Sequence, residues 1–75
     1  MDKVKHDKIV QEIAQACKEF RCKELGMTQA ELAKRLGTTP NHVSMFETGR
    51  IDSSYFLGVY CYLGFDLWKT GVSYL

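Results

Sequence analysis

The sequence lacks an arrangement of cysteines that suits cross-linking or metal binding. The three cysteines, Cys17, Cys22 and Cys61, form no C-x-x-C pair and have no histidine at metal-ligand spacing. Because their number is also odd, we expect no disulfide framework, no zinc or other metal site and no cofactor. We interpret the cysteines as small reduced side chains in the core of a cytoplasmic protein.

Long hydrophobic runs are also missing. The most apolar stretch, FLGVYCYLGF at 56–65, has ten residues and contains Gly58 and Gly64. A transmembrane helix needs about 20 apolar residues, so we expect no association with a membrane. The N-terminal MDKVKHDK is charged and leads into an amphipathic pattern, which argues against a secretory signal peptide.

The chain has almost no net charge and none of the common catalytic motifs. Ten basic and nine acidic side chains leave a formal net charge of +1, and this total gives no support for nucleic-acid binding. The sequence has no H-x-x-x-H pair, no paired-carboxylate signature and no glycine-rich phosphate loop. We therefore predict that the protein is not an enzyme.

What the sequence does contain is a series of short helical patterns. Its 75 residues, without low-complexity tracts, predict one domain over residues 1–75 with a modest core. From about residue 2 to residue 24, apolar residues recur at three- and four-residue steps and predict one apolar helix face. These residues are Ile9, Ile13, Ala16 and Phe20, and Gly26 can end the helix.

Two helix-start signals follow, eleven residues apart. Thr28 can cap a helix, and Glu31, three residues later, can complete a capping box. Thr39 is a favoured N-cap, and Pro40 is tolerated at the first helical position. Gly37 lies between the two predicted helices, so a turn of about three residues joins them.

A fourth helical pattern follows Ser53, with apolar residues at Phe56, Val59, Tyr60 and Leu63. Together the patterns predict an all-α protein. The two short helices within residues 28–47 have the layout of a helix-turn-helix unit. In that layout the second helix, here residues 39–47, enters the DNA major groove.

This unit resembles the Cro/repressor helix-turn-helix family, also called the xenobiotic-response-element family. The shared residues are Thr28-Gln29, Glu31-Leu32-Ala33, Leu36-Gly37, Val43-Ser44, Glu47-x-Gly49 and Leu63-Gly64. The resemblance covers roughly residues 20–67. It implies a compact bundle of four or five helices with a lambda-repressor-like fold. Such a bundle binds double-stranded DNA, usually as a symmetric dimer on a palindromic operator.

Eight residues are candidates for DNA contact. With Val43 and Phe46 facing inward, a helical wheel turns Asn41 and its exposed neighbours outward. Asn41 can pair in bidentate fashion with adenine, and Met45 can contact the thymine methyl group. The resemblance implies phosphate contacts for Gln29 and Arg50. The full set is Gln29, Thr39, Pro40, Asn41, His42, Ser44, Met45 and Arg50.

Two positions depart from the family pattern. The family commonly has an arginine at the position of Cys22, and that arginine usually pairs with the glutamate equivalent to Glu47. We therefore expect Glu47 to find another partner or to lie nearer to water. Arg21 is the obvious substitute, although on a regular α-helix it lies about 100° around the axis from Cys22. Tyr60 stands at a position that is often alanine.

Aromatic residues are concentrated late in the chain, in a number that a core of this size cannot bury. Tyrosine and tryptophan are favoured in the cores of interfaces. We therefore predict a homodimer in which the tail 65–75 takes part; the alternative is a tail that folds back over the bundle. The predicted interface residues are Tyr55, Tyr62, Trp68 and Tyr74.

Two functions follow from these patterns. The first is a sequence-specific DNA-binding transcriptional regulator of a bacterium, phage or mobile element, such as a small Cro-like repressor, an antitoxin or a controller protein. The second is a protein-interaction module on a helix-turn-helix scaffold that has lost DNA binding. Gln29, Asn41 and Arg50 favour the first function, whereas the near-neutral charge and Cys22 favour the second.

Overall fold

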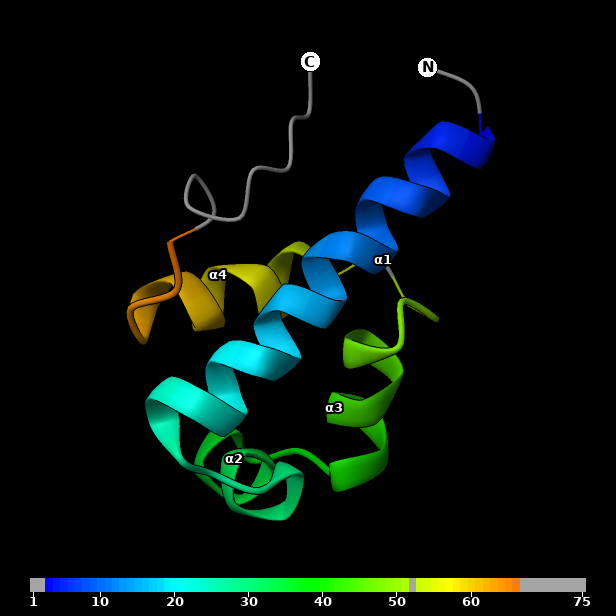
Figure 1. Ribbon diagram of the computed structural model, residues 1–75. Coiled ribbons are helices and arrows are strands. Elements are labelled where there is room, and N and C mark those ends of the chain that lie inside the picture. The colour runs from blue at the N-terminus through cyan, green and yellow to red at the C-terminus, as the bar shows by residue number, and fades with distance from the viewer. Residues whose placement is uncertain (1–2, 52, 67–75) are drawn as a thin grey trace.

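The computed structural model describes residues 3–51 and 53–66, and this part of the chain forms four α-helices (Figure 1). They are α1 (Lys3–Phe20), α2 (Gln29–Leu36), α3 (Pro40–Glu47) and α4 (Ser54–Tyr62). The helix α1 continues directly into a π-helical turn, η1 (Arg21–Leu25). The all-α prediction is therefore confirmed, with four helices.

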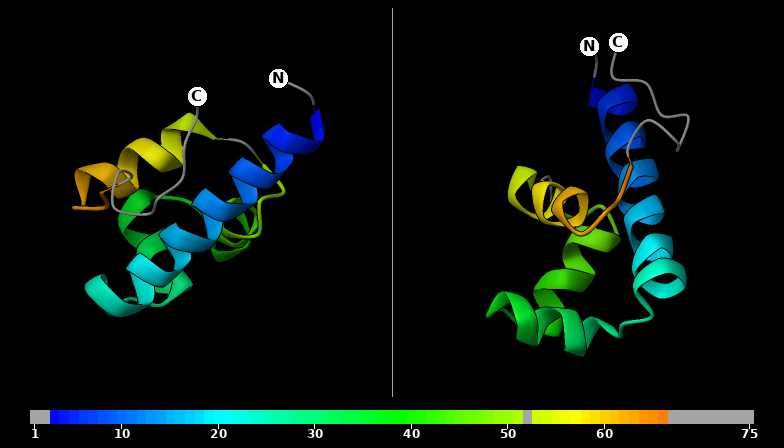
Figure 2. Two further views of the ribbon diagram at one scale, coloured as in Figure 1. Left: turned by 45° about the horizontal axis from the view of Figure 1, so that its top comes forward. Right: turned by 90° about the vertical axis from the view of Figure 1, so that its left-hand side faces the viewer.

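The long helix α1 forms one side of the molecule, and the three shorter helices pack against its other side (Figure 2). The helices α2 and α3 lie at the end reached by the C-terminal part of α1 (Figure 1). The largest fully buried side chains come from all four helices, and each is no more than 1% exposed; they are Cys17, Leu32, Val43, Phe56 and Tyr60. The bundle therefore closes around one core.

The cysteines occupy two different environments. Cys17 lies in the core, where burial, together with the nearby Cys61 and Glu47, raises the pKa of its thiol to about 12. This thiol therefore stays protonated and behaves as a small apolar group. Cys22 and Cys61 are free and exposed, so the interpretation of all three cysteines as core residues was wrong for these two.

The three predicted helix caps are confirmed. The Thr28 hydroxyl accepts from the Glu31 N–H at 3.0 Å, and the Glu31 carboxylate accepts from the Thr28 N–H at 3.1 Å, which makes a complete capping box. The Thr39 hydroxyl accepts from a backbone N–H of α3 at 3.2 Å, with Pro40 as the first helical residue. The Ser53 hydroxyl accepts from α4 at 3.3 Å. Local sequence therefore fixes where α2, α3 and α4 begin.

Glycine allows the sharp turns between these helices. Gly37 ends α2 with φ at 71°, in the left-handed region that favours glycine, and only Thr38 and Thr39 follow before α3 begins. Gly49, after α3, has φ at 75°. A Cβ atom there would lie 2.8 Å from the Gln11 Cγ atom and 3.3 Å from its Cα atom. Gly49 therefore also permits the close approach of α1 to the end of α3.

The chain after α4 returns to α1. Phe65 is buried and its ring meets the Phe20 ring edge-on, with centroids 5.7 Å apart. The first residue of the predicted tail thus packs on its own bundle. Trp68 and Tyr74, for which we predict interface roles, lie outside the described residues.

Candidate nucleic-acid interface

The helix α3 presents one buried and one exposed side. Val43 and Phe46 are 0% and 5% exposed, and the Phe46 ring stacks on the rings of Phe56 and Tyr60 in α4. This packing fixes the rotation of α3 about its axis. The opposite side carries candidates for DNA contact, of which Thr39, Pro40 and Asn41 are exposed and Ser44 and Met45 are half-buried.

Asn41 and Met45 touch each other on this exposed side. Residues four apart on an α-helix are neighbours, and here the Asn41 Nδ2 atom donates to the Met45 Sδ atom over 3.7 Å. The contact restricts the rotation of both side chains. The amide of Asn41 therefore has a preferred orientation before any ligand arrives.

His42 is exposed, as the helical wheel indicates, and its ring also contacts α4. The ring lies edge-on against the Phe56 ring of α4, with centroids 4.9 Å apart. Its Nδ1 atom is 3.0 Å from the Thr38 hydroxyl. These contacts hold the ring beside α4 and the turn, so it does not join the Asn41–Met45 pair.

A buried carboxylate connects the start of α2 with the other helices. The Glu47 side chain is 2% exposed and belongs to the last residue of α3. Its Oε1 atom accepts from Gln29 Nε2 at 3.1 Å, and its Oε2 atom accepts from the Tyr60 hydroxyl. Gln29 is half-buried at the first position of α2. The Glu47 carboxylate thus orients the Gln29 side chain, for which the family resemblance implies a phosphate contact.

Arg21 is the cationic partner of Glu47. The Arg21 Nε and Nη2 atoms donate to the two carboxylate oxygens at 2.7 and 2.9 Å, and Nη1 donates to the Met27 carbonyl at 2.7 Å. Burial acts to raise the pKa of Glu47, but the hydrogen bonds from Arg21, Tyr60 and Gln29 outweigh it and hold that pKa below its usual value. The hydrogen bond to Glu47 raises the pKa of Arg21, so both groups are charged at neutral pH.

The π-helical turn explains why Arg21 can replace the arginine expected at position 22. On a regular α-helix the residue four positions before Gly26, which is Cys22, would point toward Glu47. In η1 the Gly26 N–H donates to the Arg21 carbonyl, five residues back, so the turn holds one residue more than an α-helical turn. This extra residue shifts the register by one position, burying Arg21 and leaving Cys22 exposed. Of the two expectations for Glu47, another partner or a position nearer to water, the first is confirmed, with Arg21 as the partner.

One weak feature of the sequence indicated the contact between the Tyr60 hydroxyl and Glu47. Tyrosine stands at a position that is often alanine in the family, and in the structure its hydroxyl reaches Glu47 across the core. Burial and the Glu47 carboxylate raise the pKa of this phenol, so Tyr60 acts as a donor. Sequence reasoning did not find this partner, because the two residues are 13 positions apart on different helices.

Charge is distributed unevenly over the surface. Between residues 28 and 50 the exposed charged side chains are three cations, Lys34, Arg35 and Arg50, and one anion, Glu31. Between residues 8 and 25 there are three exposed cations and three exposed anions, so their charges cancel. The buried Glu47 is neutralised by Arg21. The α2–α3 region therefore carries a small positive excess that the net charge of the whole chain conceals.

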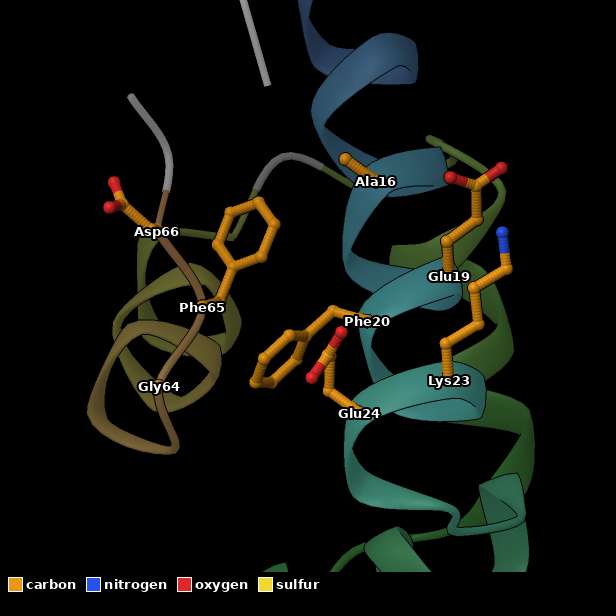
Figure 3. Close-up of a pocket in the computed structure, with 8 residues that line it drawn as sticks. All are labelled: Ala16, Glu19, Phe20, Lys23, Glu24, Gly64, Phe65 and Asp66. Atoms are coloured by element: carbon orange, nitrogen blue, oxygen red, sulfur yellow. The ribbon is translucent and has the colours of Figure 1, made fainter. Parts of the chain in front are cut away.

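A separate cavity of about 480 Å³ lies between the C-terminal end of α1, the turn η1 and the chain after α4 (Figure 3). The rings of Phe20 and Phe65 meet edge-on in it. Its lining includes none of the eight candidate residues. It consists of Ala16, Glu19, Phe20, Lys23, Glu24, Gly64, Phe65 and Asp66.

Two exposed tyrosines mark the outer side of α4. Tyr55 is 63% and Tyr62 is 90% exposed. They are seven residues apart and therefore lie on the same face of the helix, with Gly58 and Val59 between them. This apolar strip is on a different helix from the candidate DNA contacts.

Two short helices joined by a three-residue turn, with a buried ion pair beneath them, define a helix-turn-helix. The chain belongs to the helix-turn-helix family of the Cro/C1 type, whose model matches residues 18–55. This family relationship indicates DNA binding, and no catalytic family was detected. The comparisons with curated proteins and with solved structures gave no match.

The helices of the described segments 3–51 and 53–66 are too short or too polar to cross a bilayer. Within the same segments, histidine, cysteine and acidic side chains do not come together in groups of three that could hold a metal ion.

Proposed function

We propose that the protein is a sequence-specific DNA-binding transcriptional regulator of the small Cro-like repressor, antitoxin or controller type. It acts as one domain over residues 1–75 and inserts α3 into the major groove. The observation that carries this proposal is the rotation of α3. Burial of Val43 and Phe46 turns Thr39, Pro40 and Asn41 outward, and the described chain does not cover them. Since an operator is reached on the chromosome, the protein works in the cytoplasm.

Gln29 and Arg50 supply the phosphate contacts in this proposal. One N–H of the Gln29 amide donates to Glu47, which leaves the other N–H for a phosphate oxygen at the start of α2. Arg50 is exposed just after α3. Thr39, Pro40, Ser44 and Met45 lie along the groove with Asn41, and His42 serves the phosphate backbone rather than base edges because of its contact with Phe56.

A salt titration of duplex binding tests this function. Phosphate contacts release counterions, so the affinity must fall steeply as the salt concentration rises. Arg50→Ala should weaken all duplexes alike and reduce the slope of log K against log salt by about 1. Lys18→Ala is the matched control, because it removes one exposed charge from α1 and should leave the slope unchanged. No binding to any duplex at roughly 50 mM salt would overturn the proposal.

The proposed regulator is a homodimer, and α4 is the part of its interface that lies within the described residues. Tyr55 and Tyr62 offer exposed aromatic surface on one face of α4, and aromatic residues are enriched in interface cores. Trp68 and Tyr74 remain predicted members of this interface. Sedimentation of the full chain should give a dimer, and Tyr62→Ser should shift it toward a monomer. A wild-type chain that sediments as a monomer both alone and on DNA would contradict this interface.

The second candidate function is a protein-interaction module. The same exposed tyrosines favour it, since Tyr62 is 90% exposed and a contiguous aromatic surface is typical of protein contacts. The two candidates differ in the titration above, because a protein-interaction module would show no salt-dependent affinity for duplex DNA.

A further inference from the structure

Only a few side chains on the outer face of α3 are free to contact base edges. Thr48 is committed to its own helix, since its hydroxyl donates to the carbonyls of Ser44 and Met45 at 2.9 and 3.4 Å. The Thr39 hydroxyl oxygen caps α3, and proline offers no N–H. With His42 held against α4, the base-facing set reduces to Asn41, Ser44 and Met45.

This set lacks the side chains that recognise guanine. Arginine and lysine make the commonest specific contact with guanine, through its O6 and N7 atoms. Between Thr39 and Gly49 the sequence has neither residue. Arg50 lies beyond the C-terminal end of α3, away from the N-terminal residues that approach base edges in this fold.

The Asn41 amide is arranged for adenine. One of its N–H groups is engaged with the Met45 sulfur, at an Nδ2–Sδ distance of 3.7 Å. The second N–H and the Oδ1 atom remain, which makes one donor beside one acceptor. Adenine presents the complementary pair in the major groove, namely the N7 acceptor and the N6–H₂ donor.

Met45 supplies the apolar half of the same site. The Met45 sulfur lies 3.7 Å from the Asn41 amide nitrogen, a separation of about one base-pair step of 3.4 Å. The contact with Asn41 therefore holds the thioether next to the adenine position. Thymine is the base that carries a methyl group in the major groove, and apolar side chains recognise it.

We propose that α3 selects A·T base pairs, with Asn41 on an adenine edge and Met45 on the C5-methyl group of a neighbouring thymine. Each operator half-site then contains adjacent A·T pairs. This inference rests on the proposed DNA-binding function and adds the class of sequence that is bound. The contact between Asn41 and Met45 makes the two side chains one recognition unit.

Selection from a random duplex library at moderate salt, followed by substitution of single atoms, tests the inference. The selected duplexes should share adjacent A·T pairs. Replacing the key adenine by 7-deazaadenine removes N7 and should cost roughly 5- to 150-fold in affinity, the range for loss of a bidentate pair. Replacing the thymine by uracil should also weaken binding, because the methyl group is lost.

Substitutions in the protein test which side chain contacts the adenine N7 atom and which contacts the thymine methyl group. Asn41→Ala should make the chain insensitive to 7-deazaadenine, and Met45→Ala should make it insensitive to uracil. Asn41→Asp keeps the size of the side chain, suits the first turn of a helix and should shift the preference toward cytosine, whose N4 group is a donor. Lys18→Ala is the control, since it changes an exposed side chain of α1 and should leave both responses in place.

The outcomes separate this inference from the function on which it rests. Salt-dependent binding with G·C pairs selected, or with equal affinity for the adenine and 7-deazaadenine duplexes, would overturn the A·T assignment and leave DNA binding intact. Absence of binding to every duplex in the library would overturn both.

Discussion

Arg21 and Glu47 are 26 residues apart in the chain, and they form a buried ion pair with two hydrogen bonds, of 2.7 and 2.9 Å. The pair joins the turn after α1 to the last residue of α3. Because the same carboxylate also accepts from Gln29 and Tyr60, one acidic group connects the elements around the helix-turn-helix. This fully hydrogen-bonded carboxylate therefore helps to hold α3 in position beside the packing of Val43 and Phe46.

Removing one member of this pair should destabilise the protein strongly. Arg21→Met leaves the Glu47 carboxylate buried without its cation, and such a change typically costs about 3–5 kcal/mol in the free energy of unfolding. The double variant with Arg21→Met and Glu47→Gln should lose much less than the sum of the two single variants, because no charge is then buried. Urea unfolding followed by circular dichroism measures all three. Strictly additive losses would contradict the pairing.

The Tyr60 hydroxyl should contribute to stability apart from its ring. Tyr60→Phe keeps the stacking on Phe46, where the centroids are 5.5 Å apart, but removes a donor to a buried carboxylate. Hydrogen bonds to charged groups contribute about 1.5–3 kcal/mol, so a loss of that size is expected in urea unfolding. Tyr62→Phe is the matched control, because that side chain is 90% exposed. Equal effects of the two variants would exclude the hydroxyl contact.

Stability should fall in acid because of Glu47. Its pKa in the folded state lies below the ordinary value of 4.5, so folding favours the ionised carboxylate. The resulting stability is fully present above about pH 4.5 and is lost as the pH falls through the lowered pKa. Urea midpoints between pH 7 and pH 3 should show this loss, and Glu47→Gln should reduce it.

The capping box supplies the control for this pH experiment. The hydrogen bonds from Thr28 also lower the pKa of Glu31, so part of any acid effect comes from that exposed residue. Glu31→Gln keeps a side chain that can complete a capping box. It removes only the contribution of Glu31 to the loss of stability in acid. A pH dependence that disappears in Glu31→Gln and persists in Glu47→Gln would contradict the assignment to Glu47.

Two glycine substitutions should have opposite effects. Gly49→Ala places a Cβ atom 2.8 Å from Gln11 Cγ at a positive φ of 75°, and the strain should destabilise the protein by more than about 1 kcal/mol. Gly58→Ala, inside α4, meets nothing within 4 Å and should stabilise it by about 0.5–1 kcal/mol. Thermal unfolding of both variants measures the difference. A stabilising Gly49→Ala would mean that α1 does not approach this turn.

Sequence patterns predicted the helices and the inward face of α3 because the signals for both are short-range. A cap such as Thr28 or Thr39 acts on an N–H three residues away, and an apolar face follows from residues three and four apart. Val43 and Phe46 were predicted to be core residues on this basis and are buried. The roles of the eight candidate DNA contacts stay predictions.

The tertiary structure decided which distant residues meet. A single extra residue in η1 brings Arg21 rather than Cys22 to Glu47, and a helical wheel with a fixed 100° step cannot represent that change of register. Likewise, His42 packs on Phe56 because α4 lies beside α3. The sequence determined where each helix starts, since hydrogen bonds within one turn suffice for that. The choice of partners across the core was made by packing, because it depends on how whole helices are rotated and spaced.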